Sequence, residues 1–161
     1  IIGCGLIGSS ILKKVCKNKI AKKILVFEKS KSNQRTLKRF KLKFELIKKM
    51  DKKISECDFI VICAPLSEYK KIFLACNKYS KKNILITDVG SAKKDTITKI
   101  NRIKRKDINW ISSHPIAGSE VSGPLNGNEN LFVNKWSVII KQKKLLKKYL
   151  FLKNLKKIKE H

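Results

Sequence analysis

The sequence has few of the residues that build zinc sites or disulfide frameworks. It contains only two histidines, His114 and His161, and its five cysteines form no C-x-x-C pair. Neither histidine lies at ligand spacing from a cysteine, so no metal site is expected. The cysteines are odd in number and most lie in apolar runs, which favours buried free thiols in a reducing compartment.

Acidic residues are also scarce, with 12 Asp+Glu against 39 Lys+Arg and a net charge of +27. Such a balance raises the question of nucleic-acid binding. However, almost all of the positive charge is lysine, and the lysines are spread through nearly every segment. We interpret them as solvated surface charge. We therefore expect no nucleic-acid partner, although anionic ligands should be attracted in general.

No apolar run is long enough to span a bilayer, and no signal or transit peptide is recognisable. We therefore expect a soluble, cytoplasmic protein with no membrane partner. The 161 residues are enough for one domain with a real core. Only two residues precede the first glycine, whereas strands usually run about five or six residues. We therefore expect the first strand to begin before Ile1.

The first ten residues contain the pattern G-x-G-x-x-G, formed by Gly3, Gly5 and Gly8. Gly3 would permit a tight turn, Gly5 a close approach of a pyrophosphate, and Gly8 close packing of helix on strand. A helix beginning near Leu6 and Ile7 would then offer its N-terminal amide groups to the phosphates. The pattern alone is unspecific and is also compatible with a merely structural glycine turn.

An acidic residue lies at the spacing expected for a dinucleotide site. The apolar run Ile24-Leu25-Val26-Phe27 ends in Glu28, 20 residues after Gly8 (28 − 8). This spacing matches the carboxylate that binds the adenosine ribose in dinucleotide-binding domains. We therefore predict an NAD site, with NADP as the alternative because Lys29, Ser30 and Lys31 could hold a 2′-phosphate.

The rest of the chain alternates apolar runs with amphipathic segments. Strands are expected at 24–27, 44–47, 58–64, 83–88, 108–112 and 136–140. Helical segments are expected at 30–41, 51–57, 67–79 (with Ser67 as N-cap), 92–103 (with Ile97 and Ile100 facing inward) and from 141 to the end. Residues 113–130 have no period and are expected to form a long, functional loop.

Alternating strands and helices predict an α/β fold of the Rossmann type, a doubly wound and mostly parallel sheet with helices on both faces. Ligands of such sheets bind at the carboxyl ends of the strands. The segments expected there are Gly3–Gly8, Glu28, Ala64-Pro65-Leu66, Asp88–Ser91 and His114. From this placement we predict cofactor contacts from Ala64, Pro65, Leu66, Asp88 and Gly90, in addition to the glycine loop and Glu28.

Two further segments identify a family. Thr87-Asp-Val-Gly-Ser-Ala-Lys93 and Ser113-His-Pro-Ile-Ala-Gly-Ser-Glu-Val-Ser-Gly-Pro124, together with the glycine loop, resemble prephenate dehydrogenases of the arogenate/prephenate (cyclohexadienyl) type. The resemblance covers nearly the whole chain, and the His-Pro-Ile-Ala-Gly-Ser-Glu run is its most specific part. It implies NAD(P)-dependent oxidation of a ring alcohol with loss of CO2, on the route to tyrosine.

The resemblance also implies roles for individual residues. His114 matches the catalytic histidine that hydrogen-bonds the ring hydroxyl, and Ser91 matches a serine that touches both histidine and substrate. Gly118, Ser119 and Glu120 match positions around the substrate. A histidine suits this chemistry because neutral imidazole can accept a proton at physiological pH. Simpler interpretations are a loop histidine bonded to backbone, a helix-capping Ser91 and a solvated Glu120; Trp110 and Trp136 are expected to pack in the core or at an edge.

In two respects the chain differs from the family pattern. The usual start of the first strand is missing, and the second, helical domain that forms the dimer and supplies basic groups for the substrate carboxylates is not found before His161. We therefore expect residues 1–161 to be the nucleotide-binding, partly catalytic domain. The alternatives are another NAD(P)-dependent hydroxyacid or imine-reductase-type dehydrogenase, and a nucleotide-binding module without catalysis.

Overall fold

The computed structural model describes residues 1–91 and 93–140. Four α-helices lie in this part of the chain: α1 (Leu6–Lys17), α2 (Lys31–Lys38), α3 (Tyr69–Tyr79) and α4 (Lys94–Ile103). The strands are β1 (Leu25–Phe27), β2 (Glu45–Ile47), β3 (Phe59–Ile62), β4 (Leu85–Asp88), β5 (Asn109–Ile111), β6 (Ser113–Pro115) and β7 (Ser137–Ile139). Three short 3-10 turns complete the order: η1 (Lys52–Glu56), η2 (Leu66–Glu68) and η3 (Pro124–Asn126). The expected start of a helix at residue 92 and the expected helix from 141 lie outside the described residues.

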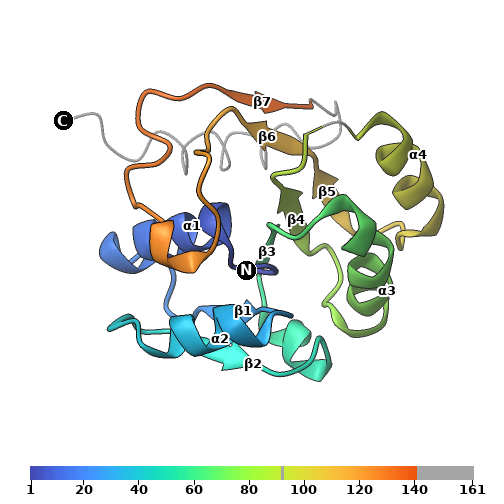
Figure 1. The fold of residues 1–161 in the computed structure, drawn as a ribbon. Helices are drawn as coiled ribbons and strands as arrows, with labels where there is room; N and C mark the ends of the chain where they lie inside the picture. The colour runs from blue at the N-terminus through green and yellow to red at the C-terminus, as the bar shows by residue number, and fades with distance from the viewer. Residues whose placement is uncertain (92, 141–161) are drawn as a thin grey trace.

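The first residues of the chain join two groups of parallel strands into one sheet. β1 pairs with β2, and β3, β4 and β5 pair in that order, all in parallel. Ile2 forms parallel bridges to both Phe27 and Ile62. The resulting order is β2-β1-Ile2-β3-β4-β5, which Figure 1 shows with the N-terminus at its centre. This is the doubly wound Rossmann-type arrangement, so the predicted fold class is confirmed.

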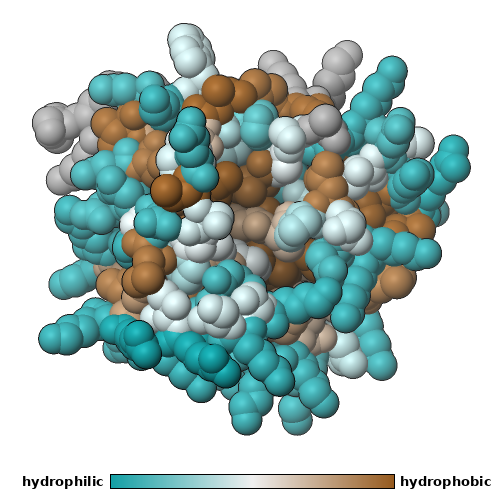
Figure 2. All heavy atoms as spheres, in the orientation of Figure 1, coloured by the Kyte–Doolittle hydropathy of each residue, from teal (hydrophilic) through white to brown (hydrophobic). Residues whose placement is uncertain are grey.

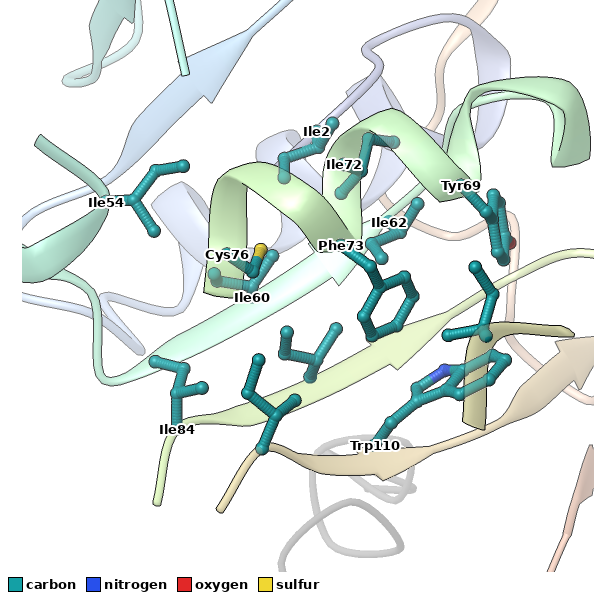
Figure 3. Close-up of a cluster of buried hydrophobic side chains, with 13 residues drawn as sticks. Ile2, Ile54, Ile60, Ile62, Tyr69, Ile72, Phe73, Cys76, Ile84 and Trp110 are labelled. Carbon is teal, nitrogen blue, oxygen red and sulfur yellow. The ribbon is translucent and has the colours of Figure 1, made fainter. Parts of the chain in front are cut away.

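Two hydrophobic clusters lie on opposite faces of the sheet. Successive residues of a strand point to opposite faces, and in β1 Val26 and Phe27 belong to different clusters. Val26 packs with Leu12 of α1 and Leu37 of α2. The larger cluster, drawn in Figure 3, contains α3 and α4 residues over β3, β4 and β5. Helices therefore cover both faces, as predicted.

Trp110 of β5 is the largest side chain of this second cluster. It is 1% exposed, and its ring lies 4.9 Å from Phe73 and 6.4 Å from Tyr69, measured between centroids. Figure 3 shows these α3 side chains reaching down to the indole. Aromatic pairs of this kind contribute roughly 0.5–1.5 kcal/mol beyond the burial of their area. Core packing of Trp110 and the inward positions of Ile97 and Ile100 are confirmed.

The expected loop over 113–130 is partly wrong. Ser113–Pro115 forms β6, which pairs antiparallel with β7 in the register His114 to Val138. A three-residue strand that contains proline shows no alternation, so its sequence carries no strand signal. His114 therefore lies in a strand that a second strand holds in place, rather than in a free loop.

Two smaller expectations are also wrong. Ser67 does not cap α3, because residues 66–68 form the 3-10 turn η2 and the helix begins at Tyr69 without a side-chain cap. Trp136 is not packed in the core or at an edge, since 84% of it is exposed. Its backbone carbonyl accepts a hydrogen bond from Ile116 at 2.8 Å, so pairing with β6 holds the main chain while the indole points outward.

No helix in the described part of the chain is long and apolar enough to cross a membrane.

Candidate nucleotide and substrate site

The glycine turn between the first bridge and α1 is tightly packed on two sides. A Cβ atom on Gly8 would lie 2.2 Å from the carbonyl oxygen of Gly3, and one on Gly3 would lie 2.8 Å from the amide nitrogen of Ala64. Gly3 also has a φ of +84°, which side chains other than glycine rarely adopt. Close helix–strand packing at Gly8 and the tight turn at Gly3 are therefore confirmed.

Gly5 is different, because no atom lies within 4 Å of the position its Cβ would occupy. It is the N-cap of α1, and no side chain caps that helix and no acidic residue lies in its first turn. The first backbone bond runs from Ser9 to Gly5 at 3.0 Å, which leaves the amides of Leu6, Ile7 and Gly8 without helical acceptors. An open glycine beside unpaired amides fits a pyrophosphate.

Glu28 follows β1 and is buried beside this turn. One carboxylate oxygen accepts a hydrogen bond from the Cys4 amide at 2.7 Å, and the other accepts one from the Ser30 amide at 2.8 Å. These two bonds fix the carboxylate against the glycine loop. Each oxygen keeps a second lone pair, so the group can still accept hydrogen bonds from ribose hydroxyls. The residues present therefore fit a dinucleotide.

The turns after β3 and β4 lie against each other. A Cβ on Gly90 would be 2.7 Å from a methyl carbon of Leu66 and 2.9 Å from the hydroxyl of Tyr69. Pro65 is exposed, and Ala64 and Leu66 are half-buried. The structure thus brings together the strand ends that the sequence places at the predicted crevice.

Asp88 is placed differently from its predicted contact with the cofactor. Its side chain is fully buried, and its two carboxylate oxygens accept hydrogen bonds from five protein donors. A carboxylate in this position has neither an exposed surface nor spare lone pairs with which to reach a ligand. The Asp88 side chain therefore belongs to the frame beneath the crevice, and this part of the cofactor prediction is corrected.

His114 lines a hollow of about 370 Å³. Its Nδ1 atom lies 3.2 Å from the carbonyl oxygen of Val89, in the turn after β4. A carbonyl can only accept, so in this contact Nδ1 carries the proton and Nε2 of the neutral ring is left with a lone pair. The backbone-bonded histidine considered above is therefore present, and it is compatible with a proton acceptor at Nε2.

The other predicted substrate residues are distributed unevenly. Gly118 lines the hollow together with His114. Ser91 is exposed, two residues beyond the carbonyl that holds the His114 ring. Ser119 and Glu120 are exposed and lie outside the lining of the hollow within the described chain.

Lys135 also lines the hollow, although sequence reasoning does not identify it. It precedes β7, and the pairing of β7 with β6, extended by the bond from Ile116 to Trp136, brings it opposite the residues that follow His114 and into the same lining. Many lysines in this sequence have the same local surroundings, so no signal short of that pairing distinguishes it. It adds one positive charge to the lining of the hollow.

One segment connects this region back to α1. Lys13 donates to the carbonyl of Gly127 at 2.6 Å, and the Asn128 amide donates to Ser10 at 2.9 Å. A Cβ on Gly127 would lie 2.1 Å from the hydroxyl of Ser9. Figure 1 shows this segment, in orange, against α1. The segment that contains Gly127 and Asn128 is therefore held against α1, the helix that follows the glycine turn.

Comparison with known proteins places these observations in a family. Residues 11–160 match the model of the prephenate dehydrogenase nucleotide-binding domain. Prephenate dehydrogenase from Lactococcus lactis is 31% identical over 93% of this chain and 42% of its own length. Cyclohexadienyl dehydrogenase from Zymomonas mobilis is 28% identical over 82% of this chain and 45% of its own length. The chain thus spans less than half the length of these two relatives.

A solved structure agrees with these matches at the level of the fold. Prephenate dehydrogenase from Aquifex aeolicus, in complex with hydroxyphenyl propionate and NAD+, superimposes with a TM-score of 0.80 at 23% identity. The superposition covers 96% of this chain and 54% of that one. The arrangement of strands and helices described above is therefore shared with that structure.

Proposed function

The chain belongs to the prephenate dehydrogenase family as its nucleotide-binding domain, and we propose that the protein oxidises prephenate or arogenate with a nicotinamide dinucleotide and releases CO2. The single observation that carries the proposal is the position of His114. Its ring lines a hollow and is held by the turn after β4. That turn leaves the same edge of the parallel sheet as the glycine turn that fits a pyrophosphate.

We propose that His114 acts as the proton acceptor. Nε2 would take the proton of the substrate's ring hydroxyl while the hydride leaves the carbon that bears this hydroxyl. The Nδ1 bond to Val89 would keep the imidazole in the required tautomer. When bound, the nicotinamide supplies the hydride acceptor. The electrons of the C–CO2 bond then complete an aromatic ring. Because aromatisation drives this last step, no dedicated residue is needed for it.

Substrate recognition would use both charge and shape. Prephenate and arogenate carry carboxylates, and Lys135 offers an ammonium group in the same hollow as His114. Gly118 leaves open space there, since nothing lies within 4 Å of its Cβ position. Ser91, Ser119 and Glu120 would contact the substrate only when it extends beyond this hollow. The remaining carboxylate-binding groups and the dimer contacts would come from the rest of a longer protein.

For the cofactor we propose NAD rather than NADP. The buried Glu28 carboxylate would bind the ribose hydroxyls and repel a 2′-phosphate. The complex of the Aquifex relative with NAD+ supports this choice. The cysteines of the described chain are all free, which supports a reducing, cytoplasmic setting.

The direct test is an assay of the full-length protein. Prephenate and arogenate are each supplied with NAD and with NADP, and formation of reduced nicotinamide and of CO2 is followed together. We expect one CO2 for each reduced nicotinamide with at least one substrate. Reduction of the nicotinamide without CO2 release, or activity only on saturated hydroxyacids or imines, would contradict the proposal.

A further inference from the structure

The side chain of Asp88 lies where five structural elements on one side of the crevice meet. One of its oxygens accepts hydrogen bonds from the Tyr69 hydroxyl at 2.8 Å, the Gly90 amide at 3.1 Å and the Lys93 ammonium at 2.7 Å. The other accepts from the Trp110 indole at 3.0 Å and the Ser113 amide at 3.3 Å. These donors come from α3, the turn after β4, the start of α4, β5 and β6.

Two of the five donors adjoin the proposed catalytic side chains. Gly90 immediately precedes Ser91, and Ser113 immediately precedes His114. The carboxylate is therefore a shared acceptor for the two backbone segments that carry them. Without this carboxylate, the Gly90 and Ser113 amides would each lose a hydrogen bond to the group that they share.

Additional bonds strengthen the same junction. The Ser113 hydroxyl donates to the backbone carbonyl of Asp88 at 2.6 Å, and the Lys93 ammonium donates to the carbonyl of Ser113 at 2.5 Å. The His114 ring then bonds to Val89, the residue that follows Asp88. The position of the ring thus depends on both strand ends keeping their separation.

The charges at this junction are balanced within the protein. The Lys93 and Asp88 side chains are 5% and 0% exposed, so neither is solvated by bulk water. A buried ion pair with additional hydrogen-bond donors resists reorganisation, whereas removal of one partner leaves an uncompensated charge. Burial and the neighbouring Asp88 charge also raise the pKa of Tyr69, so its hydroxyl remains a donor to that carboxylate.

We propose that Asp88, paired with Lys93, is a positioning residue for catalysis that holds the Ser91 turn and the His114 strand in register. Asp88 acts through the Gly90 and Ser113 amides and does not itself contact substrate or cofactor. This inference rests on the proposed function for its kinetic consequences, but its structural consequence at the His114 ring can be measured without any reaction.

The test uses Asp88→Asn in the full-length protein, with Asp88→Asn/Lys93→Met as its companion. Asparagine keeps the size of the side chain but cannot accept from all five donors. The single variant leaves Lys93 unpaired and should lower Tm by roughly 10 °C, whereas the double variant removes both charges and should recover most of that loss. In both variants kcat should fall roughly 10- to 100-fold, with KM and NAD affinity changed less than about threefold.

The second readout is the 15N resonance of the His114 ring, identified by its absence in His114→Asn. We expect a single tautomer with the proton on Nδ1 in the wild type, and a mixture in both Asp88 variants. Asn77→Ala, which removes bonds to Ile103 and Arg105 far from the crevice, is the matched control. It should lower Tm without changing the ring signal.

The outcomes separate positioning from simple charge balance. If the double variant regains wild-type kcat and a single His114 tautomer along with its Tm, Asp88 merely neutralises Lys93 and the inference is wrong. If Asp88→Asn does not fold, the double variant, which leaves no unpaired charge, supplies the ring signal and should show the mixture of tautomers on its own. An inactive wild type would contradict the proposed function alone, because the ring signal would still decide the role of Asp88.

Discussion

The ammonium of Lys29 lies 2.9 Å from the carboxylate of Glu68, which ties the residue after Glu28 to the turn before α3. The Lys29 side chain is 72% exposed, so the pair adds little stability. The pair nevertheless holds Lys29, one of the three residues after Glu28 that could bind a 2′-phosphate, beside the acidic side chain of Glu68. The pair also lowers the pKa of Glu68, so this partner stays ionised at neutral pH.

This arrangement predicts a preference for NAD. We expect the Kd for NADP to exceed that for NAD by at least about tenfold, which corresponds to about 1.4 kcal/mol. Titration calorimetry with both cofactors measures it. Glu68→Gln should release Lys29 and narrow the ratio of the two Kd values, while Lys99→Gln, at an exposed lysine of α4, should leave that ratio nearly unchanged. Equal or tighter binding of NADP by the wild type would contradict the prediction.

Substitutions of Gly8 and Gly5 are predicted to have different effects. Gly8→Ala places a methyl group 2.2 Å from the carbonyl oxygen of Gly3, so the helix must move away. The free energy of unfolding should then be lower than that of the wild type by about 1–3 kcal/mol. Gly5→Ala meets no atom within 4 Å and should fold normally, yet its methyl group would occupy the space into which a pyrophosphate fits.

Denaturant unfolding and NAD titration on the same two variants separate these effects. We expect Gly5→Ala to keep its free energy of unfolding within about 0.5 kcal/mol while NAD binding weakens at least about tenfold. A Gly5→Ala protein that binds NAD normally would show that the open glycine is not used by the cofactor.

Much of this site is predictable from the sequence because its parts are local. The spacing of Gly3, Gly5 and Gly8 and the distance to Glu28 are properties of one strand–turn–helix–strand unit. The apolar run before Asp88 likewise predicts β4. Burial of the Asp88 side chain could not be predicted, because an acidic residue at a strand end resembles a ligand-binding residue until the five donors from distant elements are in place.

The β6–β7 pair marks the other limit of prediction from sequence. Its strands are three residues long and lie more than twenty residues apart, so neither periodicity nor a turn signal relates them. The exposure of Trp136 and the position of Lys135 in the lining of the hollow both follow from that pairing. Figure 2 shows hydrophilic side chains around the rim of one face. Sequence alone does not separate Lys135 from the other lysines.

Lys135 is predicted to contribute to substrate binding. Lys135→Met removes the ammonium group from the hollow that His114 lines but keeps most of the side-chain length. We expect KM for the carboxylate-bearing substrate to rise about 3- to 10-fold, with kcat and the Kd for NAD nearly unchanged. Lys106→Met, at an exposed lysine outside this hollow, is the control. A loss of kcat at unchanged KM would contradict a binding role.

The buried thiols predict a loss of stability at alkaline pH. Burial raises the pKa of Cys76 from 9.0 to about 12. Because the folded state holds this proton more tightly than the unfolded state, the contribution is complete below pH 9 and is lost as the pH rises toward 12. Serine does not titrate in this range. The free energy of unfolding of Cys76→Ser should therefore decline less steeply with pH than that of the wild type, by up to about 1.4 kcal/mol per pH unit.

Urea unfolding of both proteins between pH 8 and pH 11 measures this difference directly. Cys16→Ser is the control, because Cys16 is only half-buried and its pKa is raised less strongly. Parallel stability curves for the wild type and Cys76→Ser would show that the Cys76 thiol does not contribute to the pH dependence.

The last prediction concerns His114, whose Nδ1 bond to Val89 leaves Nε2 with a lone pair for its proposed role as proton acceptor. His114→Asn keeps a polar group of similar reach and removes the basic nitrogen. General-base catalysis typically contributes about 10²–10⁴-fold, so kcat of the full-length enzyme should fall at least about a hundredfold. The Kd for NAD should change little, because we propose that the glycine turn and Glu28 supply that binding.

The pH dependence gives an independent test of the same role. A protonated imidazole cannot accept the hydroxyl proton, so a rate that depends on His114 should have an acidic limb in its pH profile. The His114→Asn enzyme should lose this acidic limb and retain only a low, flat rate. If the variant instead keeps a nearly normal kcat and its acidic limb with only a raised KM, His114 is a binding residue and the proton acceptor must be another group.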